Sequence, residues 1–246
     1  MEGQVSWDTQ LPEDLSSQWR IIAQNADGFT QTIPKCFSTR DGKAKLAVFT
    51  DASETAMATC SYLFDDSRSS LIMAKCRLPS IRSKPTIPKM EMNALTMAVR
   101  LTWAVFRASQ IQPDSQIPQQ ISIFSDPKNA HSWLSSSPTT SNAGVFVRNR
   151  LKETRKIVSC LEENGASVRF GYVNTHDNPA DAGKRGLTQD QLQNHKLWWE
   201  GREFLHQQEN NWSITFYPYN PQETRDVVVK EATINTMSSR KDKENQ

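Results

Sequence analysis

Short apolar runs separated by polar turns open the patterned part of the chain. Three of them, rich in strand-forming residues, occupy residues 46–50, 57–64 and 71–76. Apolar runs of this length, bounded by polar turns, are typical of strands. We therefore expect an antiparallel meander of three strands.

A long amphipathic stretch follows over residues 88–109. Pro88 suits the first turn of a helix, because its missing N–H would have no helical partner there. Small and apolar residues recur at spacings of three and four on the same stripe as Glu91. Glu91 is therefore expected to face the sheet, one turn inside the positive end of the helix dipole.

The second half of the pattern contains two strands and three helices. Strands are expected at 121–125 and 168–173, with a short helix ending near Leu134 and a longer one over 145–164 between them. A last helix carries Asp181. The order of elements predicts an α/β domain built on a mixed sheet of five strands.

Composition changes divide the chain into four expected segments. Residues 1–43 form a connector with a short helix near 7–22, and 44–190 form the main domain. Residues 191–219 are aromatic and are expected to pack on that domain, so that Trp198 and Trp199 serve packing more than base stacking. Residues 220–246 are polar and are expected to form a disordered tail.

Composition and charge narrow the class of protein only a little. With 246 residues, 23% charged residues and a formal net charge of +2, the chain resembles an ordinary globular protein, so binding of nucleic acid would need a local basic patch. No apolar stretch approaches a membrane span, and no secretory leader is visible. The four cysteines form no CxxC pair, so we expect a reduced protein of the cytoplasm or nucleus.

Four acidic residues stand where apolar runs meet turns or helix starts, and these are Asp51, Glu91, Asp126 and Asp181. Each alone could cap a turn or a helix. Because an unpaired buried carboxylate is costly, their convergence would indicate a bound cation. Oxygen ligands without a His or Cys set favour Mg²⁺ or Mn²⁺.

The motifs around these acids resemble a known family. They are Phe-Thr-Asp-Ala-Ser at 49–53, Thr-Ile-Pro-Lys-Met-Glu-Met at 86–92, Phe-Ser-Asp-Pro-Lys at 124–128 and Asn-Pro-Ala-Asp at 178–181. In this order they resemble the ribonuclease H domain of BEL/Pao-type retrotransposon polyproteins, a region also labelled a Pao retrotransposon peptidase. The resemblance extends over roughly residues 7–205, including the segments that flank the domain.

The resemblance implies a ribonuclease H-like fold, with helices on both faces of the five-stranded sheet. It also implies hydrolysis of the RNA strand of RNA–DNA hybrids by two Mg²⁺ or Mn²⁺ ions. In that scheme Asp51 bridges both ions, Glu91 and Asp126 hold the ion at the leaving group, and Asp181 holds the ion at the attacking water.

Substrate contacts are expected from residues near the acids, and these are Ser53, Lys89, Lys128 and Arg185. Selectivity for RNA would come from contacts with 2′-hydroxyl groups. Because the chain has no polymerase motif, a reverse transcriptase or another protein would act in trans. No membrane partner is expected.

The chain departs from the family pattern at several positions. Pro127 replaces the usual Ser after the third acid, and Tyr172 lies in the window where a His commonly assists catalysis. We therefore consider Tyr172 and His176 as auxiliary residues. Lys184 ends the run Ala-Gly-Lys after Asp181, where Leu-Ala-Ser is more usual.

Two other functions follow from these departures and from the family label. The first is a non-catalytic nucleic-acid-binding or scaffold module that retains the fold. The second is an aspartic peptidase, which needs two Asp-Thr/Ser-Gly motifs to share a proton between carboxylates. The chain has only Asp51-Ala52-Ser53, without Gly, so the sequence disfavours a peptidase.

Overall fold

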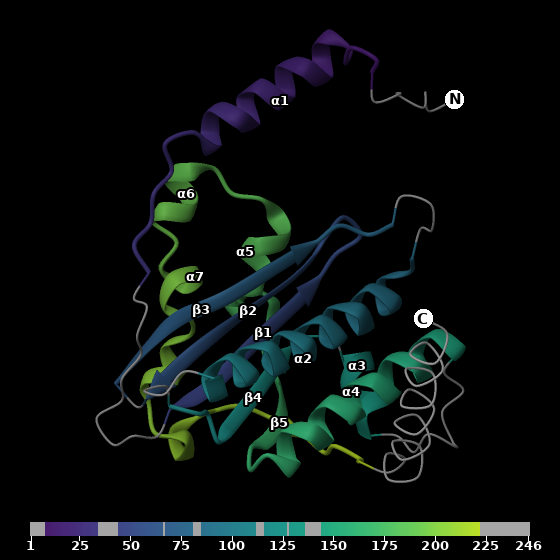
Figure 1. Cartoon of the computed structure of the whole chain (residues 1–246), viewed down its shortest axis with the longest axis vertical. Coiled ribbons are helices and arrows are strands. Elements are labelled where there is room, and N and C mark those ends of the chain that lie inside the picture. Colours follow the sequence, from purple (N-terminus) through teal and green to yellow (C-terminus); the bar gives the residue numbers. More distant parts are fainter. Residues whose placement is uncertain are drawn as a thin grey trace, which may run out of the picture.

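A computed structural model describes residues 8–33, 44–65, 67–80, 85–111, 116–126, 128–135 and 144–221. Within these ranges the chain forms a six-stranded sheet in the order β3-β2-β1-β4-β5-β6 (Figure 1). The strands are β1 (Lys45–Ala52), β2 (Met57–Asp65), β3 (Arg68–Arg77), β4 (Gln120–Ser125), β5 (Ser167–Tyr172) and β6 (Phe216–Tyr217). The predicted α/β class and mixed sheet are confirmed.

The strand pairing combines a meander with a parallel half. Strands β1, β2 and β3 pair antiparallel, whereas β4 lies parallel to β1 and β5 parallel to β4. The predicted count of five strands is wrong, because β6 adds a sixth strand antiparallel to β5. A two-residue strand is too short to leave a hydrophobic period in the sequence.

Strand β1 lies near the middle of the sheet and is buried on both faces. Because side chains alternate along a strand, Leu46 and Val48 face one core, whereas Ala47 and Phe49 face the other. This double burial explains why the run 46–50 is continuously apolar instead of alternating.

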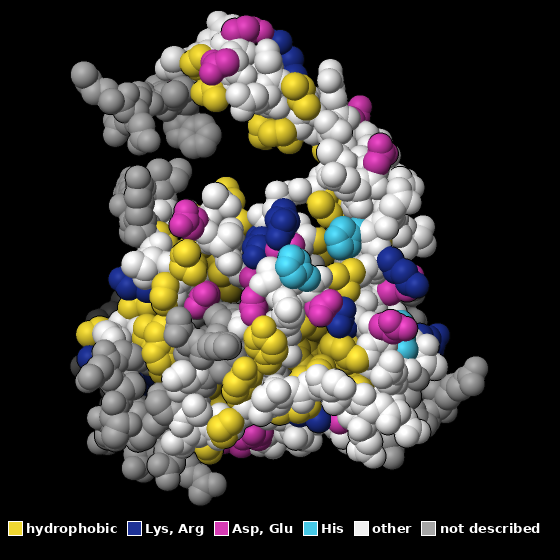
Figure 2. All heavy atoms as spheres, turned by 180° about the vertical axis from the view of Figure 1, so that it is seen from behind, with side chains coloured by type: hydrophobic (Ala, Val, Ile, Leu, Met, Phe, Trp, Pro, Cys, Tyr) yellow, Lys and Arg dark blue, Asp and Glu magenta, His cyan; other side chains and the backbone are white. Residues whose placement is uncertain are grey.

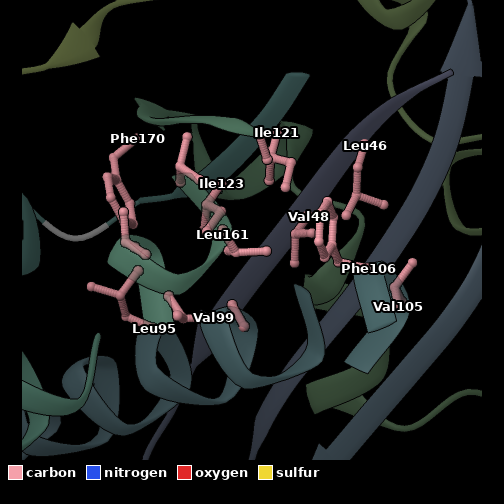
Figure 3. Packing of buried hydrophobic residues seen from close by; sticks show 14 of the residues in the cluster. Leu46, Val48, Leu95, Val99, Val105, Phe106, Ile121, Ile123, Leu161 and Phe170 are labelled. Atoms are coloured by element: carbon pink, nitrogen blue, oxygen red, sulfur yellow. The ribbon is translucent and has the colours of Figure 1, made fainter. Parts of the chain in front are cut away.

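The first core is aliphatic and lies between the sheet and two long helices, α2 (Ile87–Ile111) and α4 (Val145–Glu163). Figure 3 shows Leu95 and Val99 of α2 and Leu161 of α4 beside Val48 and Ile123 of the sheet. The short helix α3 (Lys128–Ser135) adds Leu134 to this core. All three helices were predicted, with bounds that agree within two residues where the sequence placed both ends.

The second core is aromatic and lies on the other face of the sheet. Three short helices cover it, α5 (Ala180–Arg185), α6 (Gln189–Gln193) and α7 (Lys196–Glu200). The rings of Phe49 and Phe124 stack with centroids 4.9 Å apart, and Trp198, Leu205 and Trp212 are buried in the same cluster. Trp198 therefore packs in the interior, as its sequence context suggested.

Helix α1 (Glu13–Ala26) stands apart from the sheet, and none of its residues is buried (Figure 1). It begins later and ends later than the predicted helix near 7–22, because Pro12 occupies its N-cap. Pro127 and the tail beyond residue 221 lie outside the described residues. No helix in the described part of the chain is long and apolar enough to cross a membrane.

Candidate functional site

Strands β1 and β4 bring two of the four acids to one edge of the sheet. Thr50 pairs with Ser125 in the parallel register, so Asp51 and Asp126 both lie one residue beyond that pair. Because the strands are parallel, their carboxyl ends meet at the same edge. This local geometry agrees with the expected convergence of Asp51 and Asp126.

Asn178 fixes the third element of the site against β1. Its buried side chain donates from Nδ2 to the carbonyl oxygen of Thr50 (2.9 Å) and accepts from the N–H of Ala180 (3.1 Å). The start of α5 is thereby tied to the end of β1, which brings Asp181 toward Asp51. The sequence marked Asn178 only as part of a motif, and its positioning role depends on a contact across 128 residues.

Lys184 lies between Asp51 and Asp181. Its Nζ is 2.6 Å from Asp51 Oδ2 and 3.1 Å from Asp181 Oδ1. The side chains of Lys184 and Asp51 are only 12% and 7% exposed, so this is a largely buried ion pair. The i,i+3 spacing of Asp181 and Lys184 on α5 was the signal that could have identified this residue.

The pKa values of Asp51 and Lys184 depend on burial and on the ion pairs that Lys184 makes. Burial raises the pKa of Asp51, although Lys184 partly offsets the shift; the charge of Asp181 raises that pKa further. For Lys184, burial lowers the pKa, but the ion pairs with Asp51 and Asp181 outweigh it and leave the pKa raised. Lys184 is therefore a cation at neutral pH.

Glu91 faces the same acids from α2. Its Oε2 is buried, and among the described residues it has neither a counter-ion nor a hydrogen-bond partner. Burial raises the pKa of Glu91, and the negative charges of Asp126 and Asp51 raise it further. This environment agrees with the predicted orientation of Glu91 toward the site. Burial and the neighbouring negative charges make the ionised form of its carboxylate unfavourable.

Asp126 is held by Tyr172, the last residue of β5, and by Thr175 in the short 3₁₀ helix that follows. Its Oδ2 accepts a hydrogen bond from Thr175 Oγ1, and the Tyr172 hydroxyl also hydrogen-bonds its carboxylate. Desolvation and the charge of Asp126 raise the pKa of Tyr172. Thr175 was missed by sequence reasoning, whereas Tyr172 was considered. His176 is exposed, and its backbone N–H donates to Asn174 Oδ1.

Of the residues predicted to contact substrate, Lys89 lines a cavity. This cavity of about 550 Å³ lies between β3 and α2, with Met57 and Met90 among its lining residues. Its basic residues are Lys75, Arg77, Lys89, Arg100 and Arg150, and none of the described lining residues is acidic. Met90 directly precedes Glu91 on α2, but Glu91 itself is not among the described lining residues.

The other three predicted substrate residues differ in their settings. Ser53 Oγ accepts from the N–H groups of Thr55 and Ala56 and so shapes the β1–β2 turn. Arg185 is 61% exposed, and its Nε lies 2.5 Å from Asp181 Oδ2. The side chain of Lys128 lies outside the described part of the structure.

Figure 2 shows acidic and basic side chains next to each other on the face seen from behind.

The acids of the site differ in whether other groups of the protein already engage them. Within the described ranges, no three His, Cys, Asp or Glu side chains group closely enough to hold a metal ion. Lys184 engages Asp51 and Asp181, and Thr175 and Tyr172 engage Asp126. The unpartnered oxygen of Glu91 fits a cation ligand, whereas the space between Asp51 and Asp181 already contains an ammonium group.

Comparison with known structures gives distant matches of low similarity. The NurA nuclease from Sulfolobus solfataricus is 11% identical with a TM-score of 0.35, over 66% of this chain and 59% of that chain. A foamy viral protease-reverse transcriptase in complex with dsDNA is 15% identical with a TM-score of 0.42, over 68% and 30%. Thermus thermophilus RuvC is 11% identical with a TM-score of 0.29, over 64% and 81%. The matched region thus spans less than two thirds of the length of the NurA nuclease and of the foamy viral protein.

Comparison with sequences identifies the family. No curated protein matches the chain. A family model described as the Pao retrotransposon-like RNaseH-like domain matches residues 1–127, a range that includes Asp51, Glu91 and Asp126 but not Asp181. This match confirms the resemblance seen in the motifs. Because the match covers more than half of the 246 residues, the chain belongs to the Pao retrotransposon-like RNaseH-like domain family.

Proposed function

We propose that the chain is a cation-dependent nuclease of the ribonuclease H type, which hydrolyses the RNA strand of RNA–DNA hybrids. The observation that carries the proposal is the Glu91 carboxylate. Its buried Oε2 has no hydrogen-bond partner among the described residues, and the carboxylate faces two others at the carboxyl edge of parallel strands. A cation ligated by these groups would stabilise their charged forms and remove the repulsion between them.

Asp51, Glu91 and Asp126 would hold a divalent cation, Mg²⁺ or Mn²⁺. When bound, such an ion polarises the scissile phosphate and stabilises the charge that develops on the leaving oxygen. In the reaction water adds to phosphorus, the bond from phosphorus to the 3′ oxygen breaks, and that oxygen gains a proton. The chain contributes carboxylates at defined positions, so no protein nucleophile is required.

The side chains around the acids would orient this reaction. Thr175 and Tyr172 hold Asp126 in one orientation, and the N–H of Ala52 donates to Asp51 Oδ1 at 2.8 Å. Asn178 fixes the end of β1 on which Asp51 stands. Rigid positioning of charged groups lowers the reorganisation that the reaction would otherwise need.

The basic cavity lined by Lys89 and Met90 is the proposed binding site of the nucleic-acid backbone. Its five basic residues and the absence of acidic ones among the described lining residues favour phosphate contacts. The Arg100 and Arg150 side chains are held by Glu153 at 2.5 and 3.2 Å, which keeps them in place. We propose that a strand laid along this cavity presents its phosphate to Glu91.

The proposal extends to the domain division and the partner. We infer that residues 44–190 form the catalytic unit and that 191–219 cover its aromatic core, which the burial of Trp198, Leu205 and Trp212 supports. RNA–DNA hybrids form when a polymerase copies RNA into DNA. A reverse transcriptase is therefore the proposed source of substrate.

One observation favours the second candidate, a nucleic-acid-binding module without catalysis. Lys184 already neutralises Asp51 and Asp181, two of the four acids expected to hold metal. A chain with this ion pair could bind nucleic acid through its basic cavity and leave the phosphodiester bonds intact. Cleavage and binding assays on the same substrate separate the two candidates.

The test is cleavage of an end-labelled RNA–DNA hybrid by the purified chain, with Mg²⁺, with Mn²⁺ and with EDTA. We expect cation-dependent cutting of the RNA strand and no cutting of the same sequence as double-stranded DNA. Asp51→Asn keeps the acceptor for the Ala52 N–H, so it should fold but lose the activity. Binding of the hybrid by folded protein without any cutting would establish the second candidate instead.

A further inference from the structure

We propose that the ammonium group of Lys184 is a permanent cation of the acidic site, which takes the place of a second divalent ion. The chain would then bind one divalent ion, on the Glu91 side. This inference rests on the proposed function, because it concerns the number of ions that the same acids hold.

The position of Lys184 Nζ excludes a divalent ion between Asp51 and Asp181. Nζ lies 2.6 and 3.1 Å from one oxygen of each carboxylate, and both of these oxygens are buried. A Mg²⁺ ion would lie about 2.1 Å from each oxygen that it ligates. The ion would therefore compete for the volume of the ammonium group and would be repelled by its charge.

The backbone around Lys184 keeps it in this position. A Cβ atom added at Gly183 would lie 2.9 Å from the Cβ of Ala58, so α5 packs closely on β2 at the residue before Lys184. Asn178 ties the start of the same helix to β1. Lys184 therefore reaches the acids from a helix that is fixed at both ends.

Charge balance separates the two sides of the site. Lys184 contacts Oδ1 of Asp181 and Arg185 contacts Oδ2, so each oxygen of this carboxylate has a cationic neighbour. Asp51 and Asp181 thus face two positive side chains. Glu91 has an unpartnered oxygen and lies among the negative charges of Asp126 and Asp51. A divalent ion gains most electrostatic energy on the Glu91 side.

The test is the number of Mn²⁺ ions bound per chain, measured by electron paramagnetic resonance of free Mn²⁺ during titration. The full chain is compared with Lys184→Met, which keeps the aliphatic stem and removes the charge. We expect one ion for the native chain and two for Lys184→Met. The matched control is Lys196→Met, at a lysine 82% exposed on α7, which should bind one ion.

A second variant keeps the inference testable if Lys184→Met does not fold. Asp181→Asn should leave one bound Mn²⁺, because Asp181 is not a ligand in the native chain. Two ions in the native chain that fall to one in Asp181→Asn would overturn the role of Lys184. Absence of any Mn²⁺ binding by folded native chain would instead contradict the proposed cation-dependent function, so the two failures are distinguishable.

Discussion

The two sides of the acidic site differ in how their charges are balanced. On one side, Asp51 and Asp181 meet Lys184, and Arg185 takes the remaining oxygen of Asp181. On the other side, Glu91 faces Asp126 and Asp51 with an unpartnered, buried oxygen. Acidic residues in one site therefore need not share one task, because local partners decide which of them remain able to bind a cation.

We call the part of the site around Glu91 the open side and the part around Lys184 the closed side. The largest expected effect comes from Glu91→Gln, which removes the unpartnered carboxylate of the open side. The substitution keeps the shape of the side chain but removes the charge that would ligate the ion. We expect the rate of hybrid cleavage to fall about 100-fold, equivalent to about 2.7 kcal/mol of barrier. Single-turnover cleavage at saturating Mg²⁺ measures this, and an unchanged rate would exclude Glu91 from the machinery.

The closed side should respond in stability more than the open side does. Lys184→Met removes the shared counter-ion of Asp51 and Asp181, which leaves two nearby carboxylates without it. Because Asp181 is partly exposed, we expect a loss of about 1–3 kcal/mol in the free energy of unfolding, below that of a fully buried pair. Urea unfolding in EDTA measures the loss, and Mn²⁺ should restore part of it.

The pH dependence of stability should distinguish Glu91 from the acids that are paired with Lys184. The pKa of Glu91 is raised above its ordinary value of 4.5, so the folded chain holds this proton more tightly than the unfolded chain does. The resulting stabilisation is complete below about pH 4.5 and is lost as the pH rises through the raised pKa. In EDTA, the native chain should therefore lose stability relative to Glu91→Gln as the pH rises above 4.5.

This prediction is checked by urea unfolding of both proteins at a series of pH values. The difference between their free energies of unfolding isolates Glu91, since Asp51 titrates in both. If the native chain gained stability over Glu91→Gln with rising pH, the protein would have to stabilise the charged form of Glu91, and burial beside Asp126 and Asp51 would not be the dominant influence on its pKa.

The smallest effect is expected at the rim of the closed side. Arg185 is 61% exposed, and an exposed ion pair contributes only about 0.2–1 kcal/mol. Arg185→Gln should therefore change the free energy of unfolding by less than about 1 kcal/mol, with no change in the number of bound Mn²⁺ ions. A loss as large as that of Lys184→Met would show that the two cations act as one unit.

Much of the fold was accessible from the sequence because local patterns encode it. Continuous apolar runs predicted β1, β2 and β4, and the stripe shared with Glu91 predicted the orientation of α2. The two-residue β6 was missed, since its pairing with β5 depends on tertiary packing of the C-terminal segment. Helix α1 was displaced because the turn at Pro12 was not recognised as its start.

The partners of the acids were harder to predict than the acids themselves. Asp51 and Asp126 end apolar runs, which is visible in the sequence. The contact of Lys184 with Asp51 spans β1 and α5, and the contact of Thr175 with Asp126 spans two strand ends. Such contacts follow from the pairing of β1 with β4 and of β4 with β5, which no local period reveals.

The most direct test of the asymmetric site is a crystal structure of the chain with Mn²⁺, measured at a wavelength where manganese scatters anomalously. We predict one anomalous peak, among the carboxylates of Asp51, Glu91 and Asp126, with Lys184 Nζ still between Asp51 and Asp181. Two peaks bridged by Asp51, with Lys184 displaced from the acids, would contradict the account.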